Sequence, residues 1–124
     1  MNAKKKTILL VDDSAANLTV ANALLSDIYT VYTAISGMRM FKLLDKIRPD
    51  LILLDIEMPE MDGYEVLERL KGDPDTAGIP VIFLTAHSAE ENEGQSLPDG
   101  AAGYVTKPFA SRLLLDSIER AFID

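Results

Sequence analysis

The sequence predicts a single α/β domain with a parallel five-stranded sheet that is covered by helices on both faces. Short apolar runs recur along the chain, and each is followed by a segment with helical spacing. This alternation favours a doubly wound parallel sheet, for which we expect the strand order 2-1-3-4-5. A length of 124 residues suits one domain, residues 1–124, with a core over about residues 6–122.

The first two strands are expected at Thr7–Val11 and Ile28–Thr33. Thr7–Val11 is an uninterrupted apolar run, typical of a strand that is buried on both faces. Ile28–Thr33 is rich in β-branched and aromatic residues. Between these strands, Ser14 is a plausible N-cap for a helix. The helix has three apolar residues at helical spacing: Leu18, Ala21 and Leu25.

The next helix and strand lie on either side of Pro49. Four apolar residues form one face of this helix: Met40, Phe41, Leu44 and Ile47. Pro49 ends the helix, and Leu51–Leu54 is again an apolar run of the buried type. The turn-rich segment Met58–Gly63 then leads to a short helix. The apolar face of that helix has three residues: Val66, Leu67 and Leu70.

The last two strands are expected at Pro80–Leu84 and Gly103–Val105. Proline is tolerated at the first position of a strand. Between the strands, the polar segment Ser88–Asp99 contains Gly94 and Pro98, which predict a short or mobile helix. Four apolar residues stripe a final helix: Leu114, Ile118, Ala121 and Phe122.

The composition excludes several classes of function. A net charge of −8 argues against nucleic acid as a direct partner, because phosphate binding needs clustered Lys and Arg. Without cysteine there is no disulfide framework and no thiolate zinc site, and the one histidine, His87, cannot form a His-rich metal site. No apolar run reaches the roughly 18–20 residues of a membrane span, so we expect a cytoplasmic protein with no membrane association.

Polar side chains follow four of the five expected strands. These side chains belong to Asp12, Asp13, Asp55, Thr85 and Lys107. Ligands of parallel α/β sheets bind outside the carboxyl ends of the strands, and the order 2-1-3-4-5 brings these four strand ends to one rim. Three carboxylates at one rim repel each other unless a cation lies between them. Mg²⁺ suits a few carboxylates together with phosphate oxygens.

These groups together indicate a site for a phosphoryl group. Lys107 is the only Lys or Arg between Lys71 and Arg112, and it adds a second positive charge. A cation, a lysine, a hydroxyl and a carboxylate can hold a phosphoryl group, with Asp55 as the nucleophile that forms an acyl phosphate. The glycine-rich loops of nucleotide-binding proteins and the G-x-S-x-G elbow are absent. Asp12-Asp13-Ser14 also lacks the D-x-D motif of haloacid-dehalogenase-like phosphatases, because Ser14 occupies the position of the second acid.

From about Lys6 to Phe122, the chain resembles the receiver domain of two-component response regulators. The matching motifs occur in the family's order and spacing: Asp12-Asp13, Leu53-Leu54-Asp55, Met58–Gly63, Thr85-Ala86 and Tyr104–Phe109. The resemblance implies a flavodoxin-like fold and a phosphorylation-activated signalling switch. The donor would be a phosphohistidine of a sensor histidine kinase or phosphotransfer protein, and the output would pass to a downstream protein. Slow self-dephosphorylation would reset the switch, which has no independent substrate and is not an enzyme in that sense.

The resemblance also implies the residues on the metal side of the site. Asp55 corresponds to the phosphoacceptor. Asp12 and Asp13 correspond to the acidic pair that binds Mg²⁺, with Asp13 favoured over Asp12 as the direct ligand. Glu57, two residues after Asp55, would contribute its backbone carbonyl to the metal.

The resemblance also implies which residues contact the phosphoryl group and which change conformation after phosphorylation. Lys107 corresponds to the lysine that pairs with the phosphoryl group, and the Lys107–Pro108 peptide bond is expected to be cis. Thr85 corresponds to the hydroxyl that moves onto a phosphoryl oxygen. Tyr104 corresponds to the aromatic residue that turns inward after Thr85 has moved.

Two further residues border the expected pocket. Glu57 lies two residues after Asp55, and His87 lies two residues after Thr85. We hypothesise that both tune dephosphorylation, by contacting or excluding the attacking water; the alternative is that both are exposed loop residues without kinetic effect.

Two other functions share this fold. One is a phosphate-independent interaction module, against which the joint presence of Asp12, Asp13, Asp55, Thr85 and Lys107 counts. The other is a phosphatase acting on a small substrate, against which the absence of a second domain or substrate lid counts.

Overall fold

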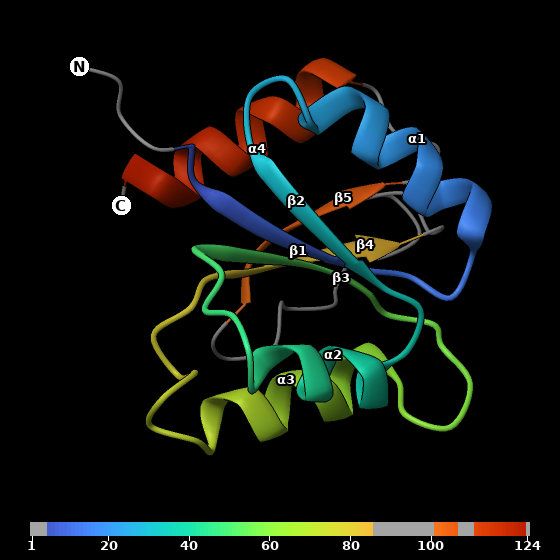
Figure 1. Ribbon diagram of the computed structural model, residues 1–124, viewed down its shortest axis with the longest axis vertical. Helices are drawn as coiled ribbons and strands as arrows, with labels where there is room; N and C mark the ends of the chain where they lie inside the picture. Colours follow the sequence, from blue (N-terminus) through green and yellow to red (C-terminus); the bar gives the residue numbers. More distant parts are fainter. Residues whose placement is uncertain (1–4, 86–100, 107–110, 124) are drawn as a thin grey trace, which may run out of the picture.

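The computed structural model describes residues 5–85, 101–106 and 111–123, and its strands and helices alternate from residue 7 to residue 85 as the sequence predicts (Figure 1). The elements are β1 (Thr7–Val11), α1 (Ala15–Leu25), β2 (Thr30–Ala34), α2 (Gly37–Leu44), β3 (Leu51–Asp55), α3 (Gly63–Lys71), β4 (Val81–Thr85), β5 (Ala101–Thr106) and α4 (Ser111–Ile123). All strand pairs are parallel, and the five-stranded sheet has the order β2-β1-β3-β4-β5. The predicted fold class and strand order are confirmed.

The sheet is the middle one of three layers. Helices α2 and α3 lie against one face, and α1 and α4 lie against the other (Figure 1). Each face has its own apolar cluster, and β3 contributes to both of them: Ile52 and Leu54 to the α2–α3 side, Leu51 and Leu53 to the α1–α4 side. Burial on both faces is the reason why this strand is an unbroken apolar run.

Side-chain caps begin the helices that follow β1 and β3. The Oγ of Ser14 accepts a hydrogen bond from the Asn17 amide at the start of α1, as predicted. The carboxylate of Asp62 accepts one from the Glu65 amide at the start of α3. Each cap starts its helix a few residues after a strand, and this fixes the path of the connecting loop at the carboxyl end of the sheet.

The predicted start of the second strand is wrong by two residues. β2 begins at Thr30 rather than at Ile28. The amides of Ile28 and Tyr29 both donate to the carbonyl of Leu25, at 3.0 and 2.8 Å, and therefore form a turn that closes α1. Tyr29 is buried there, with its ring 5.8 Å from that of Phe122, so its aromatic character reflects packing and not strand formation.

Other boundaries shift by smaller amounts. α2 ends at Leu44, so Ile47 lies beyond the helix. The sequence predicts Asp55 and Thr85 directly after the third and fourth strands. In the structure they are instead the last residues of β3 and β4. β5 is longer than predicted, running over Ala101–Thr106.

Four predictions lie outside the described residues. They concern His87, the short helix over 88–99, Lys107 and Pro108. Among the described helices, none combines the length and the apolar character that crossing a bilayer requires.

Candidate functional site

Strand register brings Asp12 and Asp55 to the same rim of the sheet. The pairing of β1 with β3 ends at Val11 and Leu54, and the two acids come next on these neighbouring strands. The carboxyl ends of parallel strands lie at one edge of a sheet, so the two carboxylates meet there.

The structure gathers Asp12, Asp13 and Asp55 into one cluster. Each residue offers a carboxylate oxygen, and these oxygens all lie within 4.8 Å of one another. Asp12 and Asp55 are 1% and 2% exposed, whereas Asp13 is exposed. The cluster is therefore buried on the side of the sheet and open to solvent on the side of Asp13.

Hydrogen bonds fix the orientation of the Asp12 carboxylate. The Ser14 amide donates to one oxygen at 2.9 Å, and the Asn17 side-chain amide donates to the other at 3.3 Å. The Asp12 amide in turn donates to the Ala34 carbonyl of β2 at 3.1 Å. The carboxylate is thus held between β1 and the first turn of α1. The sequence did not identify Asn17 as part of this site, because an Asn in the first turn of a helix is common for other reasons.

The cluster fits a magnesium ion. Mg²⁺ prefers hard oxygen ligands at about 2.0–2.1 Å, so two ligand oxygens on one ion lie at most about 4.2 Å apart. The carboxylate oxygens of the cluster lie within 4.8 Å of one another, close to that upper spacing. Three carboxylates from two strand ends therefore provide a suitable donor set.

The backbone that follows Asp55 packs tightly against the start of α3. The Gly63 amide donates to the Ile56 carbonyl at 2.7 Å. A Cβ at Gly63 would lie 2.7 Å from the Asp55 carbonyl oxygen and 2.8 Å from the Ile56 Cα, both backbone atoms. Only glycine allows this approach. Gly63 was predicted only as part of a turn, and its contact with Asp55 depends on the tertiary fold.

The loop between β3 and α3 has a fixed conformation. Met58 and Met61 are 8% and 7% exposed and pack into the apolar cluster on the α2–α3 side. Glu60 has a φ of 70°, which is in the left-handed region that non-glycine residues rarely adopt. Glu57 lies in the same loop with its side chain exposed. Buried methionines thus anchor the loop that contains Glu57, two residues after Asp55.

Thr85 and Tyr104 lie on neighbouring strands and face the same side of the sheet. Thr85 ends β4 and is 3% exposed. Tyr104 of β5 is in register with Phe83, two residues before Thr85, and packs against the cluster on the α2–α3 side. Alternate residues of a strand share a face, so all three side chains point toward that side. Thr85 is in register with Thr106, the last described residue before Lys107.

Comparison with known proteins identifies one family and many relatives. Residues 8–119 match the family model of the response regulator receiver domain. A probable cyclic di-GMP phosphodiesterase of Vibrio cholerae is 45% identical over 108 residues, which cover 87% of this chain and 24% of the relative. The response regulator PleD of Caulobacter vibrioides is 41% identical over 108 residues, which cover 86% of this chain and 24% of PleD. The chain thus spans about a quarter of the length of these two relatives.

A solved structure supports the comparison. The receiver domain of a sensor histidine kinase from Pseudomonas aeruginosa superposes with a TM-score of 0.82 and 30% identity, covering 95% of this chain and 97% of that one. That structure contains a magnesium ion coordinated in its active-site cleft.

Proposed function

The chain belongs to the response regulator receiver family, and from this premise we propose that residues 1–124 form one domain that accepts a phosphoryl group on Asp55. The single observation that supports this most strongly is the cluster of three carboxylates within 4.8 Å of one another, with Asp55 almost fully buried at the end of β3. A buried carboxylate beside two others costs stability unless a cation binds among them, and such a cation also favours an incoming phosphoryl group.

Asp12, Asp13 and Asp55 would hold the magnesium ion, together with the Glu57 carbonyl that the family implies. When bound, the ion neutralises negative charge on the carboxylates and on the phosphoryl oxygens. Asp12 keeps its orientation through the amides of Ser14 and Asn17, so the site is preorganised on that side. Asp13, which is open to solvent, lies where a phosphodonor can enter.

The reaction transfers a phosphoryl group from a histidine of the donor protein to Asp55. An oxygen of the Asp55 carboxylate forms a bond to phosphorus, while the bond between phosphorus and the donor imidazole nitrogen breaks and the imidazole leaves with the electron pair. Hydrolysis of the resulting acyl phosphate restores Asp55 and releases inorganic phosphate. The donor is the phosphohistidine of a sensor histidine kinase or a phosphotransfer protein, and the chain has no independent substrate.

Thr85 and Tyr104 would couple the phosphoryl group to the surface that a downstream protein reads. Their shared face on β4 and β5 supports this role, because a shift of the buried Thr85 hydroxyl changes the space next to Tyr104. From the family we also propose that Lys107 pairs with the phosphoryl group and that the Lys107–Pro108 bond is cis; both residues lie outside the described residues.

Incubation with acetyl phosphate and Mg²⁺, followed by intact mass measurement, tests the proposal. The protein should gain the mass of one phosphoryl group, and excess EDTA should prevent the gain because the carboxylates then repel the incoming phosphate. No gain in either condition would support the phosphate-independent interaction module. Continuous release of phosphate from a small substrate without a phosphorylated protein would support a phosphatase.

Glu57→Ala and His87→Ala test the tuning hypothesis. The half-life of the phosphorylated protein should change by about fivefold in each variant, since one polar or charged contact to the attacking water is worth up to about 1 kcal/mol. The half-life lengthens if the side chain orients the attacking water and shortens if it excludes that water. Glu68→Ala, at an exposed acid of α3, is the control. Unchanged half-lives in both variants would discard the hypothesis.

A further inference from the structure

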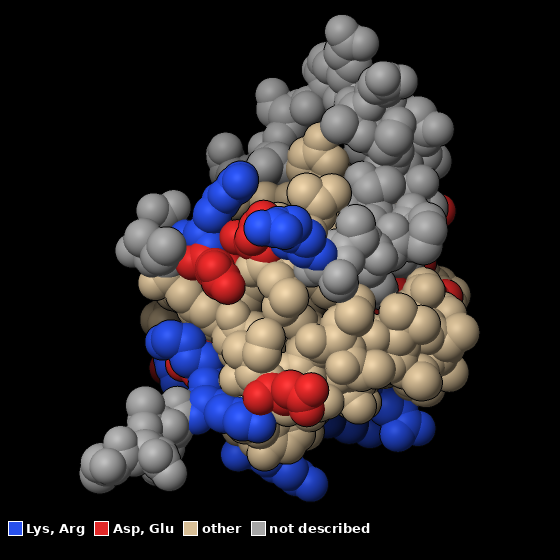
Figure 2. Space-filling view, turned by 90° about the horizontal axis from the view of Figure 1, so that it is seen from above, with Lys and Arg blue, Asp and Glu red and all other residues tan. Residues whose placement is uncertain are grey.

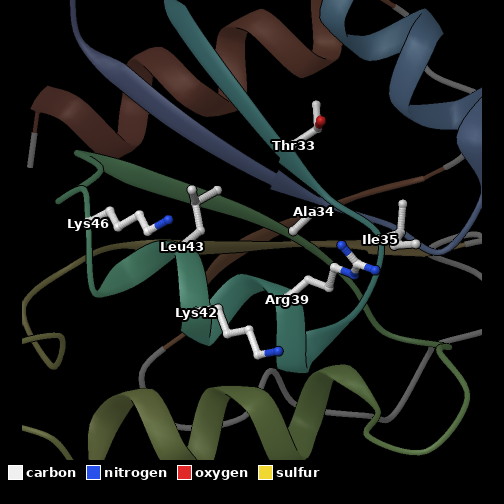
Figure 3. Close-up of a pocket in the computed structure, with 7 residues that line it drawn as sticks. All are labelled: Thr33, Ala34, Ile35, Arg39, Lys42, Leu43 and Lys46. Carbon is white, nitrogen blue, oxygen red and sulfur yellow. The ribbon is translucent and has the colours of Figure 1, made fainter.

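A groove lined by basic side chains lies between α2 and the edge strand β2. It has a volume of about 380 Å³ (Figure 3). Its lining consists of Thr33, Ala34 and Ile35 from β2 and the residue after it, and of Arg39, Lys42, Leu43 and Lys46 from α2 and its C-terminal turn. In Figure 3, Arg39 and Lys46 flank Leu43 and Ala34. We refer to this feature as the α2–β2 groove.

The basic residues of the α2–β2 groove form one stripe. Arg39, Lys42 and Lys46 are spaced by three and four residues, which places them on one side of the helical path. Like charges at these spacings destabilise a helix. No carboxylate lines the groove, and no described carboxylate forms an ion pair with any of the three. A protein of net charge −8 therefore concentrates three of its 12 Lys and Arg residues at one groove.

The groove runs along an open edge of the sheet. β2 pairs only with β1: the Thr30 amide donates to the Lys6 carbonyl, and the Ala34 carbonyl accepts from the Asp12 amide. Backbone groups of a parallel strand alternate in direction, so the N–H and C=O of Val31 and Thr33 point away from β1. Within the described residues, no partner pairs with these groups.

The edge strand itself carries none of the residues that commonly block an added strand. Natural edge strands are commonly blocked by charged residues or proline, whereas β2 has the sequence TVYTA. Three large apolar side chains are exposed near this edge: Tyr32 at 39%, Ile35 at 50% and Met38 at 55%. Figure 2 shows Lys and Arg side chains along the lower border of the molecule as seen from above, and the lining of the groove itself contributes Arg39, Lys42 and Lys46. The edge thus combines free backbone groups, apolar contact area and positive charge.

We propose that the α2–β2 groove binds an extended acidic segment of a partner protein, which adds as a strand to β2. The backbone of the segment pairs with Val31 and Thr33. Alternate side chains of an extended chain point to opposite faces, so acidic residues at every second position meet the basic stripe along α2. Charge complementarity selects this occupant: a second copy of the chain related by a two-fold axis through β2 would bring the same cations face to face.

Binding of a fluorescent peptide that alternates Glu and Val tests the proposal. Wild-type protein should bind the peptide and should show slower amide exchange at Val31 and Thr33 when the peptide is present. The triple variant Arg39→Gln, Lys42→Gln, Lys46→Gln should weaken binding by about tenfold, since three exposed charge pairs are lost. The control Lys5→Gln, Arg112→Gln, Arg120→Gln changes the net charge equally at exposed sites elsewhere and should weaken binding less than about twofold.

Each of four results would overturn the proposal. These are absence of peptide binding, equal binding of a peptide that alternates Gln and Val, equal weakening by the two triple variants, and unchanged exchange at Val31 and Thr33 in the bound state. Sedimentation that shows a dimer lost in the groove variant would assign the groove to a second copy instead. Phosphorylation by acetyl phosphate should be the same in all these proteins, which separates this test from that of the carboxylate site.

Discussion

Replacing Asp55 with Asn should abolish phosphorylation, so that the protein gains no mass after incubation with acetyl phosphate and Mg²⁺. The amide has nearly the same shape as the carboxylate, but it has no negative charge and is a poor nucleophile. Asp55 is 2% exposed at the end of β3, and carboxylate oxygens of Asp12 and Asp13 lie within 4.8 Å of its own, so the substitution also removes one of the three proposed metal ligands. Loss of both roles predicts a complete effect rather than a partial one.

Asp50→Asn is the matched control for Asp55→Asn. Asp50 precedes β3 at the opposite end of the strand, where its carboxylate is exposed and accepts a hydrogen bond from the Thr7 amide at 2.7 Å. The amide oxygen of Asn can accept the same bond, so the variant should gain one phosphoryl group like the wild-type protein. A full mass gain in Asp55→Asn would mean that another residue accepts the phosphate.

Gly63→Ala should destabilise the protein by about 1–3 kcal/mol, because the new methyl group has no space. It would lie 2.7 Å from the Asp55 carbonyl oxygen and 2.8 Å from the Ile56 Cα. Both atoms belong to the backbone between β3 and its loop, so relief requires movement of α3 or of Asp55, the proposed phosphoacceptor. We therefore expect a lower urea midpoint and slower phosphorylation together.

Two other glycines provide controls for Gly63→Ala. Gly78→Ala meets no atom within 4 Å and should change the free energy of unfolding by less than about 0.5 kcal/mol. Gly37→Ala meets the Met61 Sδ and the Val66 Cγ2 at 2.9 Å, and these side-chain atoms can shift. The loss of unfolding free energy in Gly37→Ala should therefore lie between the losses in Gly78→Ala and Gly63→Ala. Equal stability of the three variants would refute the argument from close packing at Gly63.

The sequence predicts the central strands well because they are buried on both faces. β1 matches its predicted range, and β3 differs only by including Asp55. β2 is half-exposed at the edge, so its apolar pattern is weaker and Ile28 and Tyr29 were wrongly included in the strand. Sequence patterns therefore locate elements where burial is complete and lose accuracy where turns and edge packing also use apolar residues.

The carboxylate cluster could be predicted because it follows from topology alone. Asp12 and Asp55 come at the ends of neighbouring parallel strands, and this places them together whatever the details of packing. The contact of Asn17 with Asp12 and the close approach of Gly63 to Asp55 depend on how α1 and α3 pack. No local signal in the sequence distinguishes these two residues from ordinary helix and turn residues.

The α2–β2 groove could not be predicted from the sequence for a similar reason. The sequence pattern of α2 predicts its apolar face, and Met40 of that face is buried in the core. The basic stripe through Arg39 and Lys46 has the pattern of an ordinary solvated face. It becomes a groove only because β2 lies at the end of the strand order, with its outer backbone groups beside α2.

Reduction of the phosphorylated protein with borohydride tests most directly whether Asp55 is the phosphoacceptor. Borohydride converts an aspartyl phosphate to homoserine, and peptide mass spectrometry then locates the altered residue. We predict a single conversion at Asp55, dependent on prior incubation with acetyl phosphate and Mg²⁺. Conversion at Asp12 or Asp13 with Asp55 intact would contradict the account.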